Sequence, residues 1–185
     1  IIMKYSFTYN VSVQGPINIM NEDVYMDKLV NNEINPKQVE TTYSGGPVML
    51  GLLINDQPLI QNQDSYVTVK VYNKGKGIVL NAAKLKLTVP KENIPELSDE
   101  NIISNTRMTG TAVEDSGDYY TITSETSIVG KDGLEKDENA FFTFSFKGTL
   151  PEDVIEKSTI ITGELEYRYT TDKELSFPIE KVPVQ

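Results

Sequence analysis

The sequence predicts an all-β fold, an antiparallel β-sandwich of about eight to ten short strands. Segments in which apolar and polar residues alternate recur along the chain, and clusters of Gly, Pro, Asn and Asp separate them at intervals of roughly 8 to 15 residues. No linker or repeat interrupts the strongest strands. We therefore expect one domain over residues 1–185, with an N-terminal strand at 1–14, an insertion at 15–47 and the sandwich core at 48–185.

The first strand is predicted over residues 4–14, where aromatic and aliphatic residues take every second position and small polar residues fill the others. Gly15-Pro16 is expected to end this strand. Because a flexible insertion follows, the strand is a candidate for edge pairing or for exchange with a neighbouring molecule. It also contains Asn10-Val11-Ser12, a sequon that marks Asn10 for N-glycosylation.

Two interpretations fit the insertion. Asn21, followed by two acidic residues and spaced apolar ones, predicts a capped helix that ends near Asn31, before Pro36. The alternative is an irregular polar segment over residues 17–44, because turn-forming Asn-Asn and Asn-Pro pairs lie within it.

The apolar run at residues 48–54 predicts a strand buried on both faces at the centre of the core, with Gly51 as a possible site for a bulge. Residues 65–90 predict a hairpin, because two alternating segments flank a turn at residues 73–77.

The valines of the first segment of that hairpin are expected to pack against a face of three phenylalanines, and two lysines of the second segment are expected to face water. These residues are Val67, Val69 and Val71, then Phe142, Phe144 and Phe146, and finally Lys84 and Lys86.

Further strands and turns follow along the chain. A short helical turn is possible at residues 96–103. The remaining predicted elements are strands at 108–113 and 119–124 around a turn at 114–118, a turn at 130–133, a strand at 141–146, and strands at 159–170 and 175–182 joined by a hairpin at 171–173.

Composition excludes several function classes. The formal charge of −10 disfavours binding to nucleic acid or to anionic lipid. The chain contains no Cys, His or Trp, so thiol catalysis, imidazole acid–base chemistry and the common zinc sites are ruled out. No apolar run reaches the roughly 18 residues of a membrane helix. Ile1-Ile2-Met3 leads directly into the first strand, which fits either the removal of a signal or anchor or an ordinary strand start.

Carboxylates are the remaining acid–base groups, and they cluster in turns, where a solvated acidic face is the ordinary explanation. We expect no catalytic site and no cofactor-binding site. Oxygen ligands in these turns raise the possibility of bound calcium, a metal that suits extracellular β-sandwiches. The candidate ligands are Asp115, Asp118, Asp132 and Asp137.

Part of the chain resembles a known family. The segment Val67-Thr68-Val69-Lys70-Val71-Tyr72-Asn73-Lys74-Gly75, the strand ending at Pro90, Gly117-Asp118-Tyr119-Tyr120 and the strand at 141–146 are similar to the immunoglobulin-like modules called CARDB and to related repeat domains of prokaryotic surface proteins. The resemblance covers about residues 60–170. It implies an immunoglobulin-like antiparallel sandwich that serves in adhesion, in a surface layer or in a filament.

These observations lead to a non-enzymatic extracellular structural or adhesion protein of a prokaryotic envelope. Its expected partner is protein, either another copy in a filament or surface layer built by strand addition, or a different envelope protein. Two alternatives remain open. One is a carbohydrate-binding module or a carboxylate-dependent glycosidase-like enzyme, with tyrosines stacking on sugars. The other is the extracytoplasmic part of a membrane-anchored machine.

Overall fold

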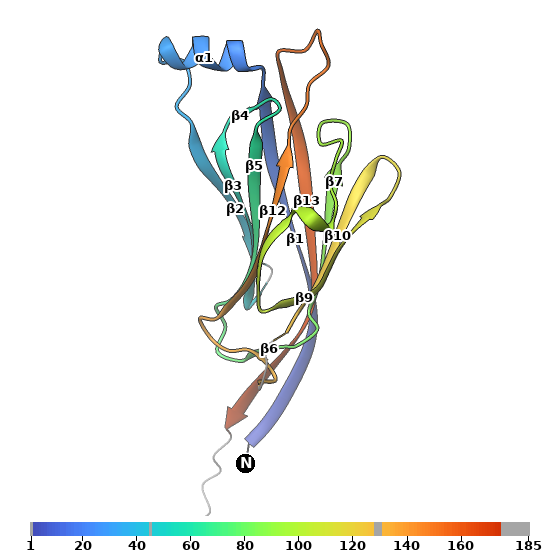
Figure 1. The fold of residues 1–185 in the computed structure, drawn as a ribbon. Helices are drawn as coiled ribbons and strands as arrows, with labels where there is room; N and C mark the ends of the chain where they lie inside the picture. The colour runs from blue at the N-terminus through green and yellow to red at the C-terminus, as the bar shows by residue number, and fades with distance from the viewer. Residues whose placement is uncertain (1, 45, 128–130, 175–185) are drawn as a thin grey trace, which may run out of the picture.

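The chain folds into two facing β-sheets with one short α-helix at one end (Figure 1). The structure, a computed structural model, describes residues 2–44, 46–127 and 131–174. The all-β prediction is confirmed. Buried apolar side chains from both sheets form one cluster between them.

The larger sheet is organised around β13, which has 19 residues, as β1 does. β1 pairs with β13 antiparallel along 19 residues, while β7 and β6 pair with the opposite edge of β13. β10 and β9 extend the sheet beyond β7, and β11 extends it beyond β6. The strands of this sheet are β1 (Ile2–Met20), β4 (Leu59–Ile60), β6 (Ile78–Leu80), β7 (Lys84–Pro90), β9 (Met108–Asp115), β10 (Tyr119–Thr126), β11 (Gly133–Leu134) and β13 (Glu156–Glu174).

The second sheet has the order β2-β3-β5-β12-β8. Its central strand β5 carries alternating buried valines, because every second side chain of a strand points into the sandwich. The strands are β2 (Lys37–Ser44), β3 (Val48–Gln57), β5 (Asp64–Asn73), β8 (Ile102–Thr106) and β12 (Asn139–Lys147).

β3 differs from its prediction. Val48, Leu50, Leu52 and Ile54 are fully buried, but Met49 and Leu53 between them are only half-buried. The strand therefore buries one face completely rather than both. Its pairing with β5 is regular from residue 48 to residue 54, so no bulge forms at the glycine in this run.

The hairpin predicted at residues 65–90 is wrong. β5 lies in the second sheet and β7 in the larger one, and the chain crosses between them through β6. The predicted contact between valines and phenylalanines does occur, but side by side within one sheet, where Val69 lies opposite Phe142 and Val67 opposite Phe144. Lys84 and Lys86 are exposed, as expected.

The first strand does not end at Gly15-Pro16 but continues to Met20. Proline lacks a backbone N–H, and a strand tolerates it where that N–H would not serve the ladder. In β1 the backbone nitrogen of Pro16 faces away from β13, so no hydrogen bond of the β1–β13 ladder is lost. Ile17 and Ile19 beyond it are fully buried, which anchors this continuation in the core.

The rest of the predicted insertion is only partly irregular. A helix, α1 (Glu22–Val30), begins after Asn21, whose side chain accepts a hydrogen bond from the Asp23 N–H at 3.0 Å, so the helical interpretation is confirmed. β2 then pairs with β3, which the sequence interpretation missed because its residues alternate weakly in polarity. None of the residues of α1 is buried.

Near the C-terminal end, the hairpin predicted at residues 171–173 is wrong. β13 runs straight through these residues to Glu174, because each pairs with a residue of β1. The strand predicted at 175–182 lies outside the described residues. The hairpin of β9 and β10 is confirmed, and the predicted helical turn is reduced to a 3-10 turn at Asp99–Asn101.

Candidate functional site

The N-terminal half of β1 and the C-terminal half of β13 form a two-stranded extension that leaves the body of the sandwich (Figure 1). We call residues 2–10 together with 166–174 the terminal ribbon. Its inner boundary is Val11, the first residue of β1 that is buried. Asn10 pairs with Glu166 at this boundary, and Ile2 pairs with Glu174 at the tip.

One face of the ribbon is apolar and exposed. Met3, Tyr5, Phe7 and Tyr9 continue the core-facing side of β1 past the point where the second sheet covers it. Tyr5 and Phe7 are 38 % and 47 % exposed, and their rings stack with centroids 6.4 Å apart. Tyr9 stacks in turn on buried Tyr167, with centroids 5.3 Å apart. An aromatic stripe therefore leads from the core out into solvent.

The edge of β1 that faces away from β13 also presents backbone N–H and C=O groups. The Pro16 carbonyl accepts from Gln57 Nε2 and the Asn18 N–H donates to Gln57 Oε1, both at 2.8 Å, while the Met20 carbonyl accepts from the Gln61 N–H. All three residues are even-numbered, so even-numbered backbone groups point away from β13. Because the β1–β13 register has no shift, the same holds toward the N-terminus.

The backbone groups of Lys4, Ser6 and Thr8 consequently point outward from the ribbon. Over the described part of the chain, strand pairing on this edge of β1 is limited to Ile19 and Met20 with β4. The opposite edge of the ribbon is partly covered, since β6 pairs with Tyr169 and Thr170 of β13. The ribbon thus offers one open edge and one apolar face.

The other edge strands are less suited to pairing. β2, β8 and β9 have eight, five and eight residues, and each meets its neighbour through a register shift. Short length and bulges of this kind discourage edge-to-edge association. β1 has 19 residues in continuous register and only one charged residue, Lys4.

The ribbon is electrically balanced, although the chain as a whole carries −10. It contains equal numbers of basic and acidic residues. The basic residues are Lys4, Arg168 and Lys173, and the acidic residues are Glu166, Asp172 and Glu174. The excess negative charge therefore belongs to the rest of the molecule.

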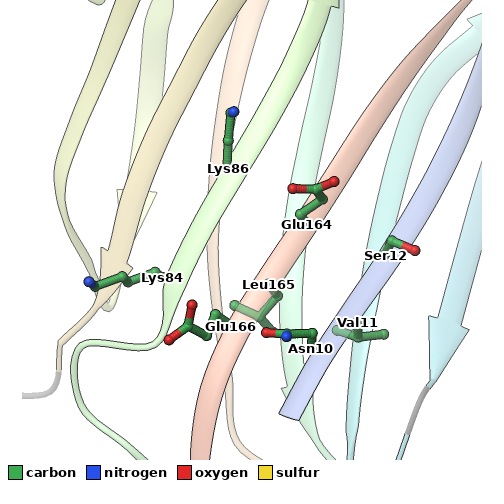
Figure 2. Close-up of a pocket in the computed structure, with 8 residues that line it drawn as sticks. All are labelled: Asn10, Val11, Ser12, Lys84, Lys86, Glu164, Leu165 and Glu166. Atoms are coloured by element: carbon green, nitrogen blue, oxygen red, sulfur yellow. The ribbon is translucent and has the colours of Figure 1, made fainter. Parts of the chain in front are cut away.

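A second feature is an open hollow of about 540 Å³ on the outer face of the larger sheet, across β1, β13 and β7 (Figure 2). Lys86 lies opposite Glu164, and Lys84 opposite Glu166, on neighbouring strands. Opposite charges in facing positions of an antiparallel pair stabilise a sheet by about 0.2 to 1 kcal/mol each. The hollow has no aromatic side chain in its lining and its two carboxylates are exposed, so it lacks both a sugar-stacking platform and a dry site for acid–base catalysis.

The four candidate calcium ligands do not converge on one site. Asp115 and Asp118 lie in the β9–β10 hairpin beside the end of β7, because the Lys91 N–H donates to the Asp118 carbonyl. Asp132 lies beside the start of β7, which spans roughly 23 Å as a seven-residue strand. Over the described residues, no three acidic residues are grouped as metal ligands would be.

Two of these carboxylates already have protein partners. Asp115 forms an ion pair with Lys91, which lowers the pKa of that carboxyl, and the Gly117 N–H adds to the effect. Asp137 accepts a hydrogen bond from the Tyr72 hydroxyl at 2.9 Å, which raises the pKa of Tyr72. These contacts fix turns, and calcium binding stays a prediction.

The segment around Asp137 also holds a small ion-pair network. Glu138 contacts Lys131 at 2.9 Å and Arg107 at 3.4 Å. Lys131, the Glu135 N–H and Arg107 lower the pKa of Glu138. The network joins the loop before β12 to the segment between β8 and β9. Lys131 also contacts Glu135 at 3.4 Å, so two basic and two acidic side chains compensate one another, which indicates a structural role.

Asn10, the predicted glycosylation site, lies exposed beside the hollow at the inner boundary of the terminal ribbon (Figure 2). The side chain is accessible on the outer face of β1. Modification itself stays a prediction.

A comparison with protein-family models finds no match to this chain, and a comparison with curated protein sequences finds none either. The CARDB-like resemblance and the immunoglobulin-like topology therefore stay predictions. Among the described helices, none has the length and apolar character that crossing a membrane requires.

Sequence reasoning selected the first strand as a candidate edge but missed the ribbon. The missed component is β13, whose pairing with β1 joins residues 136 to 172 positions apart. One available signal was the charge pattern, because residues 5–21 contain no charged residue in a chain where 24% are charged. A long segment in which apolar and polar residues alternate and none is charged indicates a strand whose edge is not protected against pairing with another strand.

Proposed function

We propose that this protein is a non-enzymatic, immunoglobulin-like structural or adhesion module of a prokaryotic envelope, and that it works by binding protein through its terminal ribbon. The extracellular location, the surface-layer or filament role and the absence of catalysis are part of this proposal. The function of the module is then mechanical: it holds a partner while the sandwich supplies a rigid base.

The apolar ribbon is the observation that carries the proposal. A folded domain gains nothing in stability from leaving Met3, Tyr5 and Phe7 in water, since each such side chain contributes about 1.5 to 3 kcal/mol only when it is buried. Exposed contiguous apolar surface on a folded domain marks a site of interaction. An open strand edge next to it adds backbone hydrogen bonds, the combination used in recognition by strand addition.

The test compares the association of the wild-type chain with that of a Tyr5→Ser/Phe7→Ser double variant. Both side chains lie outside the buried cluster, so the variant is expected to fold with an unchanged unfolding midpoint. Sedimentation velocity over a range of concentrations should show association of the wild-type chain and its loss in the variant. Tyr119→Ser is the matched control, because Tyr119 is 47 % exposed but lies on β10, away from the ribbon.

A variant that associates as the wild-type chain does would refute the ribbon as the binding surface. A wild-type chain that stays monomeric throughout would refute self-association, and the proposed function would then require a different envelope protein.

The two alternatives receive less support. Sugar stacking needs aromatic rings gathered on one surface, and the most exposed tyrosines away from the ribbon lie on separate strands, namely Tyr43 on β2, Tyr66 on β5 and Tyr119 on β10. The rings of the ribbon are gathered, but they lie beside an open strand edge, which favours a protein partner there. Binding on a glycan array would reverse this preference. An extracytoplasmic part of an anchored machine is compatible with the same ribbon, which would then bind a subunit of that machine.

A further inference from the structure

We infer that the partner of the terminal ribbon is a second copy of this chain, and that the two free β1 edges pair antiparallel about a two-fold axis at Ser6. This inference rests on the proposed function and names its partner. The pairing joins the larger sheets of two molecules into one continuous sheet, in the order β13-β1-β1-β13.

The direction of the backbone groups determines which residues make the hydrogen bonds. Lys4, Ser6 and Thr8 point their N–H and C=O groups outward, by the same parity that Pro16 and Asn18 show. In an antiparallel pair, two residues whose groups point at each other exchange two hydrogen bonds. With the axis at Ser6, this residue meets its own copy, and Lys4 of each copy meets Thr8 of the other.

The same register matches the apolar faces. Tyr5 of one copy lies directly opposite Phe7 of the other, twice by symmetry, and Met3 lies opposite Tyr9. Aromatic cross-strand pairs contribute about 0.2 to 1 kcal/mol each relative to alanine pairs, beyond the burial of their area. A register with the axis at Lys4 would instead place two lysines opposite each other, which is unfavourable.

Charge favours a second copy over an unrelated partner. Two identical surfaces repel when each carries net charge of one sign, as most of this acidic molecule does. The ribbon is balanced, and Lys4 is the single charged residue of the pairing strand. It is therefore the part of the molecule where a self-complementary contact avoids electrostatic repulsion, and an isologous two-fold contact requires just such a surface.

The structure also limits how far the pairing extends. Beyond residue 14, the Gln57 side chain already binds the outward groups of Pro16 and Asn18, and β4 occupies Ile19 and Met20. The free edge is thus confined to the N-terminal part of β1. Because β1 also contributes Val11 and Val13 to the core, it joins a second copy while remaining paired with its own β13.

The test uses the absence of cysteine from the chain, so that a single introduced thiol reports on one position. Ser6→Cys places two thiols at the axis, where the Cα atoms of a hydrogen-bonded pair lie about 5.5 Å apart, within disulfide range. Ser12→Cys is the matched control, since it is exposed on the same face of the same strand. In this register its two copies lie roughly 40 Å apart, at about 3.4 Å per residue along each strand.

Under mild oxidation, the Ser6→Cys chain should form a disulfide-linked dimer at least about tenfold faster than the Ser12→Cys chain, because pairing raises the effective concentration of the two thiols. Adding Tyr5→Ser/Phe7→Ser to Ser6→Cys should remove this advantage. Sedimentation of the wild-type chain is measured in parallel.

Equal rates for the two cysteine variants would overturn the pairing. If the wild-type chain associates while Ser6→Cys stays unlinked, the edge pairing is wrong but the ribbon remains a binding surface, provided that Tyr5→Ser/Phe7→Ser abolishes association. If the wild-type chain does not associate at all, both the pairing and self-association fail.

Discussion

Asn73 is a fully buried polar residue that organises the loops at the ribbon end of the sandwich. Its Nδ2 group donates to the Gly77 carbonyl at 2.8 Å and to the Leu134 carbonyl at 2.9 Å, and its Oδ1 accepts from the Gly75 N–H at 3.0 Å. One side chain therefore ties the end of β5, the loop that leads to β6, and β11 together. The asparagine and glycine of the predicted turn thus have a shared structural role.

We predict that Asn73→Asp destabilises the fold by about 2 to 4 kcal/mol, because aspartate cannot donate to the two carbonyls and would bury a charge beside them. Asn73→Ala should cost a similar amount, since it leaves the same backbone groups unpaired. Urea denaturation measures both, with exposed Asn10→Ala as the control. If Asn73→Asp were as stable as the wild-type chain, the structural role assigned to Asn73 would be contradicted.

Tyr167 lies where the aromatic stripe of the ribbon enters the core. Its side chain is 1 % exposed, and this burial raises the pKa of the hydroxyl to about 12. The folded state therefore favours the neutral phenol more strongly than the unfolded chain does, whose tyrosine pKa is about 10. The stabilising contribution is complete below about pH 10 and is lost as the pH rises from about 10 to about 12.

Accordingly, the free energy of unfolding should fall by about 2 to 3 kcal/mol more in the wild-type chain than in Tyr167→Phe over that interval. Urea denaturation at a series of pH values provides the comparison, and the difference between the two chains cancels the titration of other groups. Parallel pH profiles for wild type and Tyr167→Phe would show that this hydroxyl is not the source.

At the scale of elements, Gln57 determines where the open edge of β1 ends. This side chain is 6 % exposed and bridges from β3 in the second sheet to Pro16 and Asn18 of β1. It replaces the strand partner that β1 lacks at this point. β4 continues the protection at Ile19 and Met20.

Gln57→Leu should therefore destabilise the chain by about 1 to 2 kcal/mol, because two part-buried hydrogen bonds to the backbone are lost while the side-chain volume is kept. The Asn18 amide should also exchange faster with solvent. The control is Gln63→Leu, the same substitution at an exposed glutamine six positions further along the chain, and it should change stability little. Unchanged exchange at Asn18 in Gln57→Leu would argue against this role.

Local patterns predicted most strands, because alternation reports which side chains face a core. They did not predict which sheet each strand joins. β5 and β7 alternate equally well and lie close in sequence, yet they belong to different sheets. Gly15-Pro16 and residues 171–173 resemble ends and turns, but the long ladder between β1 and β13 overrides both local preferences. The candidate site depends on that ladder, so sequence alone supplied only one of its two strands.

At the scale of the whole molecule, exposed apolar side chains occur at both ends. The terminal ribbon projects at one end, and α1, with Met26 and Val30 exposed, lies at the other (Figure 1). Of these two ends, as far as the structure describes them, the ribbon is the one that combines such side chains with an open strand edge and balanced charge. The proposed association is directed to this one end, because the acidic remainder of the surface repels other copies of the chain.

The most direct test of the account is amide hydrogen exchange along the ribbon, measured by NMR at low and at high protein concentration. The Phe7 amide points toward β13 and should exchange slowly at both concentrations. The Ser6 and Thr8 amides point outward, so they should exchange rapidly in dilute solution and become protected as the concentration rises. If these two amides exchange equally fast at both concentrations, the open edge of β1 is not used for pairing between copies.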